Sequence, residues 1–405
     1  AITMRQPTPP DRGEQVSQMA PMQISQTSRR RAELTDLAVE LAAHTAGFRR
    51  SLPQGILESL ADLVRSMNCY YSNLIEGHDT HPVDIERALN GDYSSNPEQR
   101  NLQLEAKAHI AVQQWIDQGG LRGRAVTFDG ICEIHSRFAD QLPEELLFAN
   151  DPETDERLQV FPGALRQRDV KVGRLVPVSP GALPRFLAQF EKAYSGLGTT
   201  EAIIATAAAH HRLLWIHPFL DGNGRVARLM SHAMLLDTLD TGGVWSIARG
   251  LGRDVGAYKL HLTACDSPRR NDLDGRGNLS EEALATFTSF FLETCLDQVT
   301  FMEELVQPER FRDRVSRWVA EEVSAGALPN KSGLILEAIM HRGELRRGDV
   351  PALLEASDRH ARRTVAALVK QSVVTSVSTR APLRLAFPAR LAPRWMPGLF
   401  PERPF

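Results

Sequence analysis

Twelve consecutive residues bring together the groups that a nucleotide site needs. His217 comes first, and Asp221, the glycine-rich run 222–224, Arg225 and Arg228 follow it. An imidazole with an ordinary pKa near ~6.5 can accept a proton around neutral pH. A carboxylate offers the hard oxygen ligand that Mg²⁺ takes up beside substrate phosphates. The spacing therefore predicts a site where a proton is moved next to a bound phosphate chain.

The glycine run is suited to hold phosphate. Gly222 and Gly224 tolerate positive φ, and together with Asn223 they let successive backbone N–H groups face one concavity. A helix is expected to follow over about residues 225–236, and the N–H groups at its start attract anions because they have no partner within the helix. The two arginines lie three positions apart, so both guanidiniums are predicted to reach the same ligand.

A second helix must hold the imidazole. The apolar segment Ala202–Ile216 predicts a helix that ends at His217, since Pro218 lacks an N–H and disfavours helix at the preceding residue. His210 shares a helix face with His217 and invites a metal interpretation together with His211. No further ligand follows at helical spacing, so we expect both to be ordinary buried or hydrogen-bonded imidazoles.

Residues 217–228 match, without a departure, the pattern His-x-Phe-x-(Asp/Glu)-Gly-Asn-Gly-Arg-x-x-Arg. This is the signature of the Fic family, which the chain resembles. Fic proteins are largely helical nucleotidyl transferases that move AMP from ATP onto a hydroxyl of a target protein. The resemblance implies ATP as substrate, Mg²⁺ as cofactor and a target protein with a Ser, Thr or Tyr hydroxyl. It also implies a base (His217), a magnesium ligand (Asp221), an anion hole (Gly222, Asn223, Gly224), a phosphate contact (Arg225) and a γ-phosphate contact (Arg228).

A more distant segment resembles the same family. Residues 72–77 match the inhibitory motif (Ser/Thr)-x-x-x-Glu-(Gly/Asn) through Ser72, Glu76 and Gly77. They precede the Fic motif, as in the class whose inhibitory helix lies before the core. The resemblance implies that Glu76 pairs with Arg228 and occupies the space of the γ-phosphate, because carboxylate and guanidinium match in bidentate geometry. The alternative is an ordinary charged residue at the end of an amphipathic helix.

The remaining core is expected to be helical, with one exception. Periodic apolar residues predict helices between Ala32 and Gly119 and over Leu284–Leu305. The segment Leu158–Pro177 has β-forming residues around Gly173 and predicts a hairpin. In Fic proteins a hairpin flap holds the target as an added strand. Tyr258 lies in another stretch that resembles the family, and we expect it to help line the adenine pocket.

The last 75 residues form a basic module, with 13 Lys and Arg against 6 Asp and Glu. Helices are predicted over 334–340, 350–356 and 358–371, the last capped by Ser357, and two strands over 373–387. This order suggests a winged helix-turn-helix, with Arg359, Arg362 and Arg363 at the exposed start of the third helix, where a recognition helix meets DNA. The alternative is a module for protein docking or dimerisation.

An apolar tail ends this module and needs a surface to cover. Its prolines, Pro393, Pro397 and Pro401, are expected to keep it extended. We expect it to pack on the chain's own helices or on a second copy, which would make a homodimer. Its apolar residues are Leu391, Trp395, Met396, Leu399 and Phe400.

The predicted fold class is mainly α: a Fic-type helical bundle with a small β-hairpin flap, followed by a winged helix-turn-helix. Four parts are expected: a flexible N-terminus (1–28), unless it docks on something, a helical region with the inhibitory helix (29–120), the Fic core (121–308), and the winged-helix domain with its tail (309–405).

Composition sets outer bounds. A chain of 405 residues with 42% hydrophobic content can bury a large core. Its formal net charge of −3 argues against a wholesale nucleic-acid binder. No apolar run approaches the ~18 residues of a spanning helix, and the four cysteines have no CxxC spacing, which indicates a cytoplasmic protein with no membrane partner.

The predicted function is an autoinhibited protein adenylyltransferase. Two alternatives stay open. In some Fic proteins the inhibitory glutamate positions a water that removes AMP, so the chain could be a de-AMPylating enzyme. It could also be a DNA-binding regulator whose Fic pocket senses a nucleotide.

Overall fold

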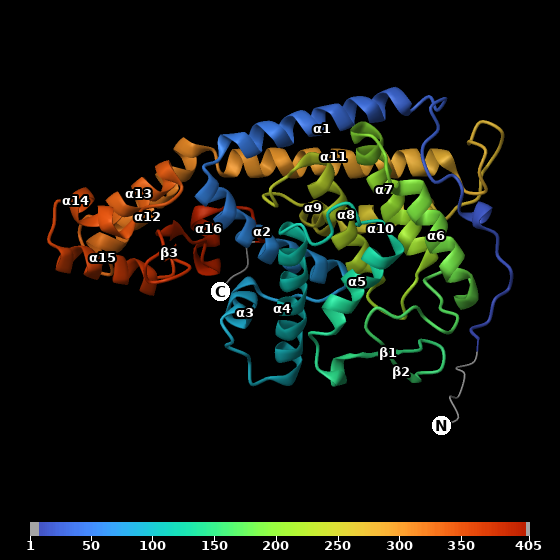
Figure 1. The fold of residues 1–405 in the computed structure, drawn as a ribbon, viewed down its shortest axis with the longest axis horizontal. Coiled ribbons are helices and arrows are strands. Elements are labelled where there is room, and N and C mark those ends of the chain that lie inside the picture. The colour runs from blue at the N-terminus through green and yellow to red at the C-terminus, as the bar shows by residue number, and fades with distance from the viewer. Residues whose placement is uncertain (1–7, 402–405) are drawn as a thin grey trace.

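The computed structural model describes residues 8–401, and these are mainly helical (Figure 1). The helices up to the Fic motif are α1 (Arg31–Ser51), α2 (Gln54–Ile75), α3 (Pro82–Leu89), α4 (Pro97–Asp117), α5 (Phe128–Ala139), α6 (Leu183–Tyr194) and α7 (Thr199–Ile216). The later helices are α8 (Asn223–Leu239), α9 (Ile247–Arg253), α10 (Val255–Ala264), α11 (Glu281–Leu305), α12 (Pro308–Ser324), α13 (Ser332–Arg342), α14 (Val350–Leu354), α15 (Asp358–Lys370) and α16 (Ala392–Trp395). Short 3₁₀ turns are η1 (Val16–Met19), η2 (Glu144–Leu146), η3 (Pro180–Ala182), η4 (Arg347–Asp349) and η5 (Ala389–Leu391).

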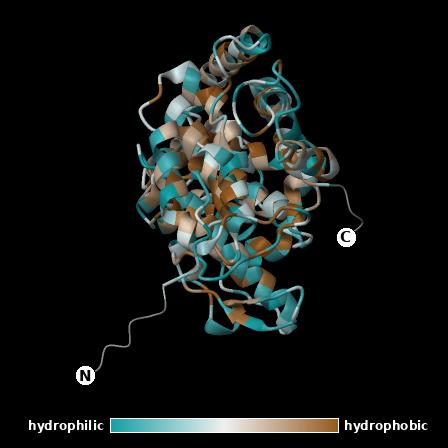
Figure 2. Cartoon of the chain, turned by 90° about the vertical axis from the view of Figure 1, so that its right-hand side faces the viewer, coloured by the Kyte–Doolittle hydropathy of each residue, from teal (hydrophilic) through white to brown (hydrophobic). Residues whose placement is uncertain are grey.

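The two helices that flank the motif form the centre of the bundle. α7 packs on α8, and α1 and α11 run side by side along one edge of the body (Figure 1). α7 is buried over nearly its whole length, which suits its apolar sequence. α2 packs on α4 and α9, and its burial extends to Ile75. Apolar residues gather in the middle of the body in Figure 2. A rigid centre therefore holds the ends of α2, α7 and α8.

The N-terminal segment is docked rather than flexible, from residue 8 onward. Ser179 donates its backbone N–H to Glu14 at 2.8 Å, and Tyr194 donates its hydroxyl to the Met22 carbonyl at 2.6 Å. The buried Arg212 donates to the Pro21 carbonyl at 2.6 Å. The expectation of a flexible segment over 1–28 is wrong here because these partners lie far along the sequence. Residues 1–7 lie outside the described residues.

The flap hairpin lies earlier than predicted. β1 (Phe148–Asn150) pairs antiparallel with β2 (Arg157–Gln159), with Ala149 opposite Leu158. The turn forms because Asp151 accepts the N–H of Glu153 at 2.8 Å. Between 158 and 177 only an isolated bridge, Val172 to Leu175, forms beyond β2. In that segment the Arg166 side chain is buried. The pattern of apolar residues did not predict this burial.

The C-terminal module lies at one end of the body (Figure 1). After α13, α14 and α15, β3 (Val374–Thr375) pairs antiparallel with β4 (Arg384–Leu385). The predicted order of three helices and a hairpin is thus present, although the second helix is shorter because Glu355 turns the chain with φ 47°. The predicted fold class, mainly helical with a small hairpin, is confirmed, whereas the winged-helix assignment stays a prediction.

The apolar tail packs on the chain's own helices. Trp395, Met396 and Leu399 are buried. It is not extended throughout, as the prolines suggested, because η5 and α16 form within it and Pro393 occupies the first turn of α16, where its missing N–H costs nothing. The alternative of a second copy, and with it a homodimer, stays a prediction.

Candidate functional site

His217 closes the end of α7 in a left-handed conformation, with φ 53°. Its N–H donates to the Leu213 carbonyl at 2.9 Å. Its own carbonyl accepts from Arg166 Nε at 2.7 Å, and the same guanidinium donates to the Arg168 carbonyl at 3.0 Å. A buried arginine therefore ties the backbone of the base to the segment that follows the flap. Sequence reasoning missed Arg166, since it stands 51 residues before His217 and outside any motif.

The His217 imidazole faces a cavity of about 390 Å³ next to the flap. Other lining residues are Asn150, Asp151, Val176 and Leu220. Burial, together with the charge of Arg166, lowers the pKa of His217 to about 4. The imidazole is therefore neutral at pH 7 and able to accept a proton.

Asn223 shapes the loop after His217. Its side-chain oxygen accepts the Phe219 N–H at 3.0 Å, and its amide group donates to the Phe219 carbonyl at 2.8 Å. Gly222 has φ 84°, which a larger residue adopts only with strain. Asp221 is exposed, with one carboxylate oxygen accepting the Gly222 N–H at 2.7 Å. The loop thus places exposed Asp221 directly before the start of α8, where the first N–H groups have no partner within the helix.

His135 braces this loop from α5. Its Nδ1 accepts the Gly163 N–H at 2.9 Å, so the proton sits on Nε2, which donates to the Asp221 carbonyl at 3.1 Å. The ring also stacks on Phe219, with centroids 4.1 Å apart. Sequence reasoning missed His135 as well. The signal it offered was a polar side chain at a buried position of an amphipathic face.

Arg228 meets the inhibitory motif, as predicted. Its Nε donates to the Ser72 hydroxyl at 2.9 Å, and its guanidinium pairs with the Glu76 carboxylate. Glu76 caps the C-terminal end of α2, and Gly77, with φ 85°, turns the chain away. A Cβ at Gly224 would lie 2.6 Å from Glu76 Oε1, so the glycine makes room for the pair. The carboxylate therefore sits over the start of α8.

The charges around Glu76 favour its ionised form. Burial would raise the pKa of this carboxyl, but the charge and hydrogen bond of Arg228, with the charges of Arg225 and Lys259, hold it below its usual value. Arg225 is not aimed at the same partner as Arg228. Its guanidinium lies 4.0 Å from the Phe138 ring centroid and 3.8 Å from Glu105. The two arginines were predicted to reach one ligand, and the structure holds them on different neighbours.

Tyr258 of α10 is buried. Its hydroxyl is 2.6 Å from His210 Nε2, and His210 Nδ1 is 2.8 Å from the Ser231 hydroxyl. His211 is bonded to Asp266 at 2.7 Å. Hydrogen bonds thus account for both histidines that invited a metal interpretation. The role of Tyr258 in an adenine pocket stays a prediction.

Asp221 is the carboxylate that could hold a metal ion at this loop. A single carboxylate with substrate phosphates and waters is a common arrangement for Mg²⁺. Across residues 8–401 no three His, Cys, Asp or Glu side chains gather as a metal site of their own. No helix among these residues is long and apolar enough to cross a membrane.

Comparison with known proteins agrees with this geometry. Residues 125–235 match the sequence model of the Fic/DOC family, and they contain His217, the glycine loop and both arginines. Residues 125–235 therefore form a Fic/DOC-type domain. Its fold is similar to the crystal structure of a Fic family protein from Desulfovibrio desulfuricans G20, with a TM-score of 0.51 and 16% identity over 90% of this chain and 98% of that one.

Among curated proteins, the chain is similar to proteins named protein adenylyltransferase Fic. It is 37% identical to that of Drosophila erecta over 113 residues, which cover 27% of this chain and 20% of the relative. It is 25% identical to that of Drosophila persimilis over 215 residues, or 51% and 39% of the two chains. The chain thus spans well under half the length of these relatives.

Proposed function

We propose that this protein is an adenylyltransferase that moves AMP from ATP onto a Ser, Thr or Tyr hydroxyl of a target protein. The observation that carries the proposal is a half-buried imidazole with a lowered pKa, His217, which lines the flap cavity just before the start of α8. The name of the curated relatives supports the same chemistry.

Each residue of the site has a separate role in the proposed transfer of AMP. The target oxygen attacks the α-phosphorus of ATP, and its proton passes to the free electron pair of His217. A new O–P bond forms, the bond between the α-phosphorus and the pyrophosphate oxygen breaks, and pyrophosphate leaves with that electron pair. Asp221 would hold Mg²⁺, which neutralises charge on the phosphates. The N–H groups at the start of α8, with Arg228, would hold the phosphate chain. Arg225 would join them only after its guanidinium leaves Phe138 and Glu105.

We further propose that the enzyme is autoinhibited. The pair between Glu76 and Arg228 supports this, because a guanidinium engaged by one carboxylate cannot also form its bidentate contacts with a γ-phosphate. ATP would then bind in a pose that places its α-phosphorus away from the incoming hydroxyl.

Labelled ATP provides the direct test. The purified protein, its Glu76→Gly variant and the double variant Glu76→Gly with His217→Ala are incubated with Mg²⁺ and cell lysate. We expect strong protein labelling only with Glu76→Gly. Labelling by the double variant at the same level would overturn the assignment of His217. If the protein without substitutions removes the label from a target that was AMPylated beforehand, and the Glu76→Gly variant does not, this would favour de-AMPylation.

A second candidate activity concerns the C-terminal module. Arg359, Arg362 and Arg363 are all exposed on α15, near its capped start. We propose that this module is a winged helix whose α15 binds duplex DNA through phosphate contacts. Its order of helices and hairpin supports that assignment.

A further inference from the structure

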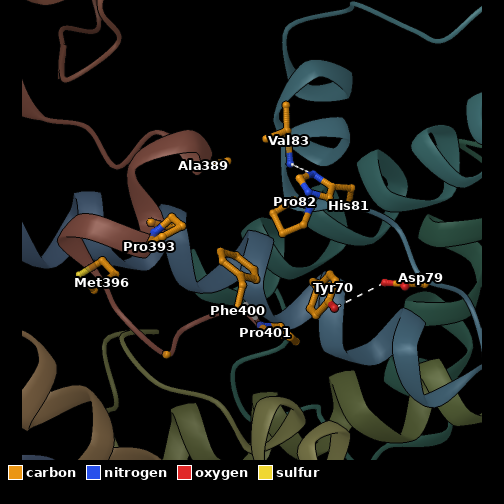
Figure 3. Close-up of a pocket in the computed structure, with 12 residues that line it drawn as sticks. Tyr70, Asp79, His81, Pro82, Val83, Ala389, Pro393, Met396, Phe400 and Pro401 are labelled. Carbon is orange, nitrogen blue, oxygen red and sulfur yellow. Dashed lines mark hydrogen bonds between the residues drawn. The ribbon is translucent and has the colours of Figure 1, made fainter. Parts of the chain in front are cut away.

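The C-terminal tail contacts the same helix that carries Glu76. Tyr71, five residues before Glu76, donates its hydroxyl to the Leu399 carbonyl at 2.9 Å. The neighbouring Tyr70 meets the Phe400 ring edge to face, with centroids 5.5 Å apart. Figure 3 shows Phe400 beside Tyr70 at the edge of a cavity. Both contacts fall on the last two turns of α2, directly before the inhibitory glutamate.

Arg249 of α9 also holds the tail beside α2. Its guanidinium donates to the Gly398 carbonyl at 2.7 Å and to the Leu399 carbonyl at 3.3 Å. Gly252, one turn on in α9, lies so close to Tyr71 that an added Cβ would be 2.9 Å from the tyrosine side chain. Tyr71 is therefore held between a rigid helix and the tail.

The other end of the tail packs on α12, which is counted here with the C-terminal module (308–405). Arg314 of α12 donates to the Trp395 carbonyl at 2.8 Å, and the Trp318 and Trp395 rings meet with centroids 5.3 Å apart. The module also holds the start of α2, where Arg384 of β4 pairs with Glu58. A displacement of the module would thus be passed to α2 at both ends.

The tail is loosely packed on its remaining side. A cavity of about 260 Å³ separates it from the start of α3, and its lining includes Pro82, Val83, Pro393 and Met396 (Figure 3). Atoms that line a cavity lack dispersion contacts on that side. The tail is therefore easier to displace than a fully packed segment.

We propose that residues 395–400 form a latch, which keeps the end of α2 in place and so keeps Glu76 on Arg228. Movement of the C-terminal module, when it binds a partner, withdraws the latch and weakens the inhibition. The effect of the latch on the position of α2 does not depend on the proposed function, whereas its effect on activity rests on that function.

Hydrogen exchange tests the latch without reference to activity. Tyr71→Phe removes the hydroxyl and keeps the ring, whereas Phe400→Ala removes the aromatic contact. The reporters are the amides of Gly77 and His78, which donate to the Leu74 and Asn73 carbonyls. Amide exchange at residues 72–78 should become about two- to tenfold faster in both variants. Loss of one such contact shifts the equilibrium between the closed and the locally opened end of α2 by about that factor. Arg394→Ala is the matched control, because this tail residue pairs with Glu321 on α12 instead of α2.

The same variants are then tested for labelling with ATP. Each should raise labelling in the otherwise unchanged chain and give no further increase with Glu76→Gly. Unchanged exchange at 72–78, or exchange that rises equally over the whole chain, would overturn the latch. Faster local exchange without labelling by any variant, Glu76→Gly included, would support the latch and overturn the proposed transferase.

Discussion

The Glu76 carboxylate and the Arg228 guanidinium form an ion pair across 152 residues of sequence. The arginine side chain is 3% exposed and the glutamate 42%, so the carboxylate forms the outer, replaceable half of the pair. Ser72 holds the arginine in the same orientation through its Nε. Removing the carboxylate should therefore free a positioned cation rather than a mobile one.

Glu76→Gly should raise auto-AMPylation at least about tenfold, which corresponds to ~1.4 kcal/mol less inhibition. Ser72→Ala should give a smaller increase, because Arg228 keeps its carboxylate partner. Labelling is measured at saturating ATP and Mg²⁺. Glu355→Gly is the control, since Glu355 also caps a helix but belongs to α14. Equal labelling by the Glu76 variant and the unchanged protein would show that Glu76 is an ordinary helix-end residue.

His217→Ala in the Glu76→Gly background should lower AMP transfer by about 10²–10⁴-fold, the range for loss of a positioned base. ATP affinity, measured by calorimetry, should change little because the phosphate contacts remain. His44→Ala serves as the control, since that imidazole is partly exposed on α1. A His217 variant with near-normal transfer would remove the base assignment.

His135 is expected to act as a positioning residue. Removing it in the Glu76→Gly background frees the Asp221 carbonyl and the Phe219 ring, so His135→Ala should lower transfer by about ten-fold. The Mg²⁺ concentration that gives half-maximal transfer should also rise. A general loss of stability would lower the amount of active enzyme without changing that concentration. If the magnesium dependence stays the same while transfer falls, His135 does not act by positioning Asp221.

The pH profile of the reaction should report the half-buried imidazole of His217. Because the pKa of His217 is lowered to about 4, the base is already unprotonated well below neutrality. In the Glu76→Gly variant, kcat/KM should rise as pH increases through about 4 and be level above about pH 6. An exposed histidine would give its rise near ~6.5. A midpoint there would mean that water reaches the imidazole in the working enzyme.

DNA binding by α15 should depend steeply on salt. Replacing Arg359, Arg362 and Arg363 by Ala should flatten the slope of log affinity against log salt by up to about three units, roughly one for each phosphate that is no longer neutralised. Fluorescence anisotropy with a duplex measures this. A matched triple Ala replacement at the exposed Arg29, Arg50 and Arg100 should leave the slope unchanged. Absence of any salt-dependent binding would favour protein docking.

The sequence by itself determined the local chemistry of this protein. The order of residues 217–228 predicted the family, the helix that ends at His217 and the loop that precedes α8, because these features depend on neighbours along the chain. Residues 72–77 also predicted a partner for Arg228, through their resemblance to the inhibitory motif of the family.

The tertiary structure decided what depends on distant contacts. Arg166 and His135 position the base and its loop, yet their partners there lie 51 and 86 residues away in the sequence, so no local spacing predicts these contacts. Burial, which no spacing expresses, lowered the pKa of His217. The docking of residues 8–28 and the return of the tail to α2 arise in the same way, because apolar and polar groups find partners only once the bundle has formed.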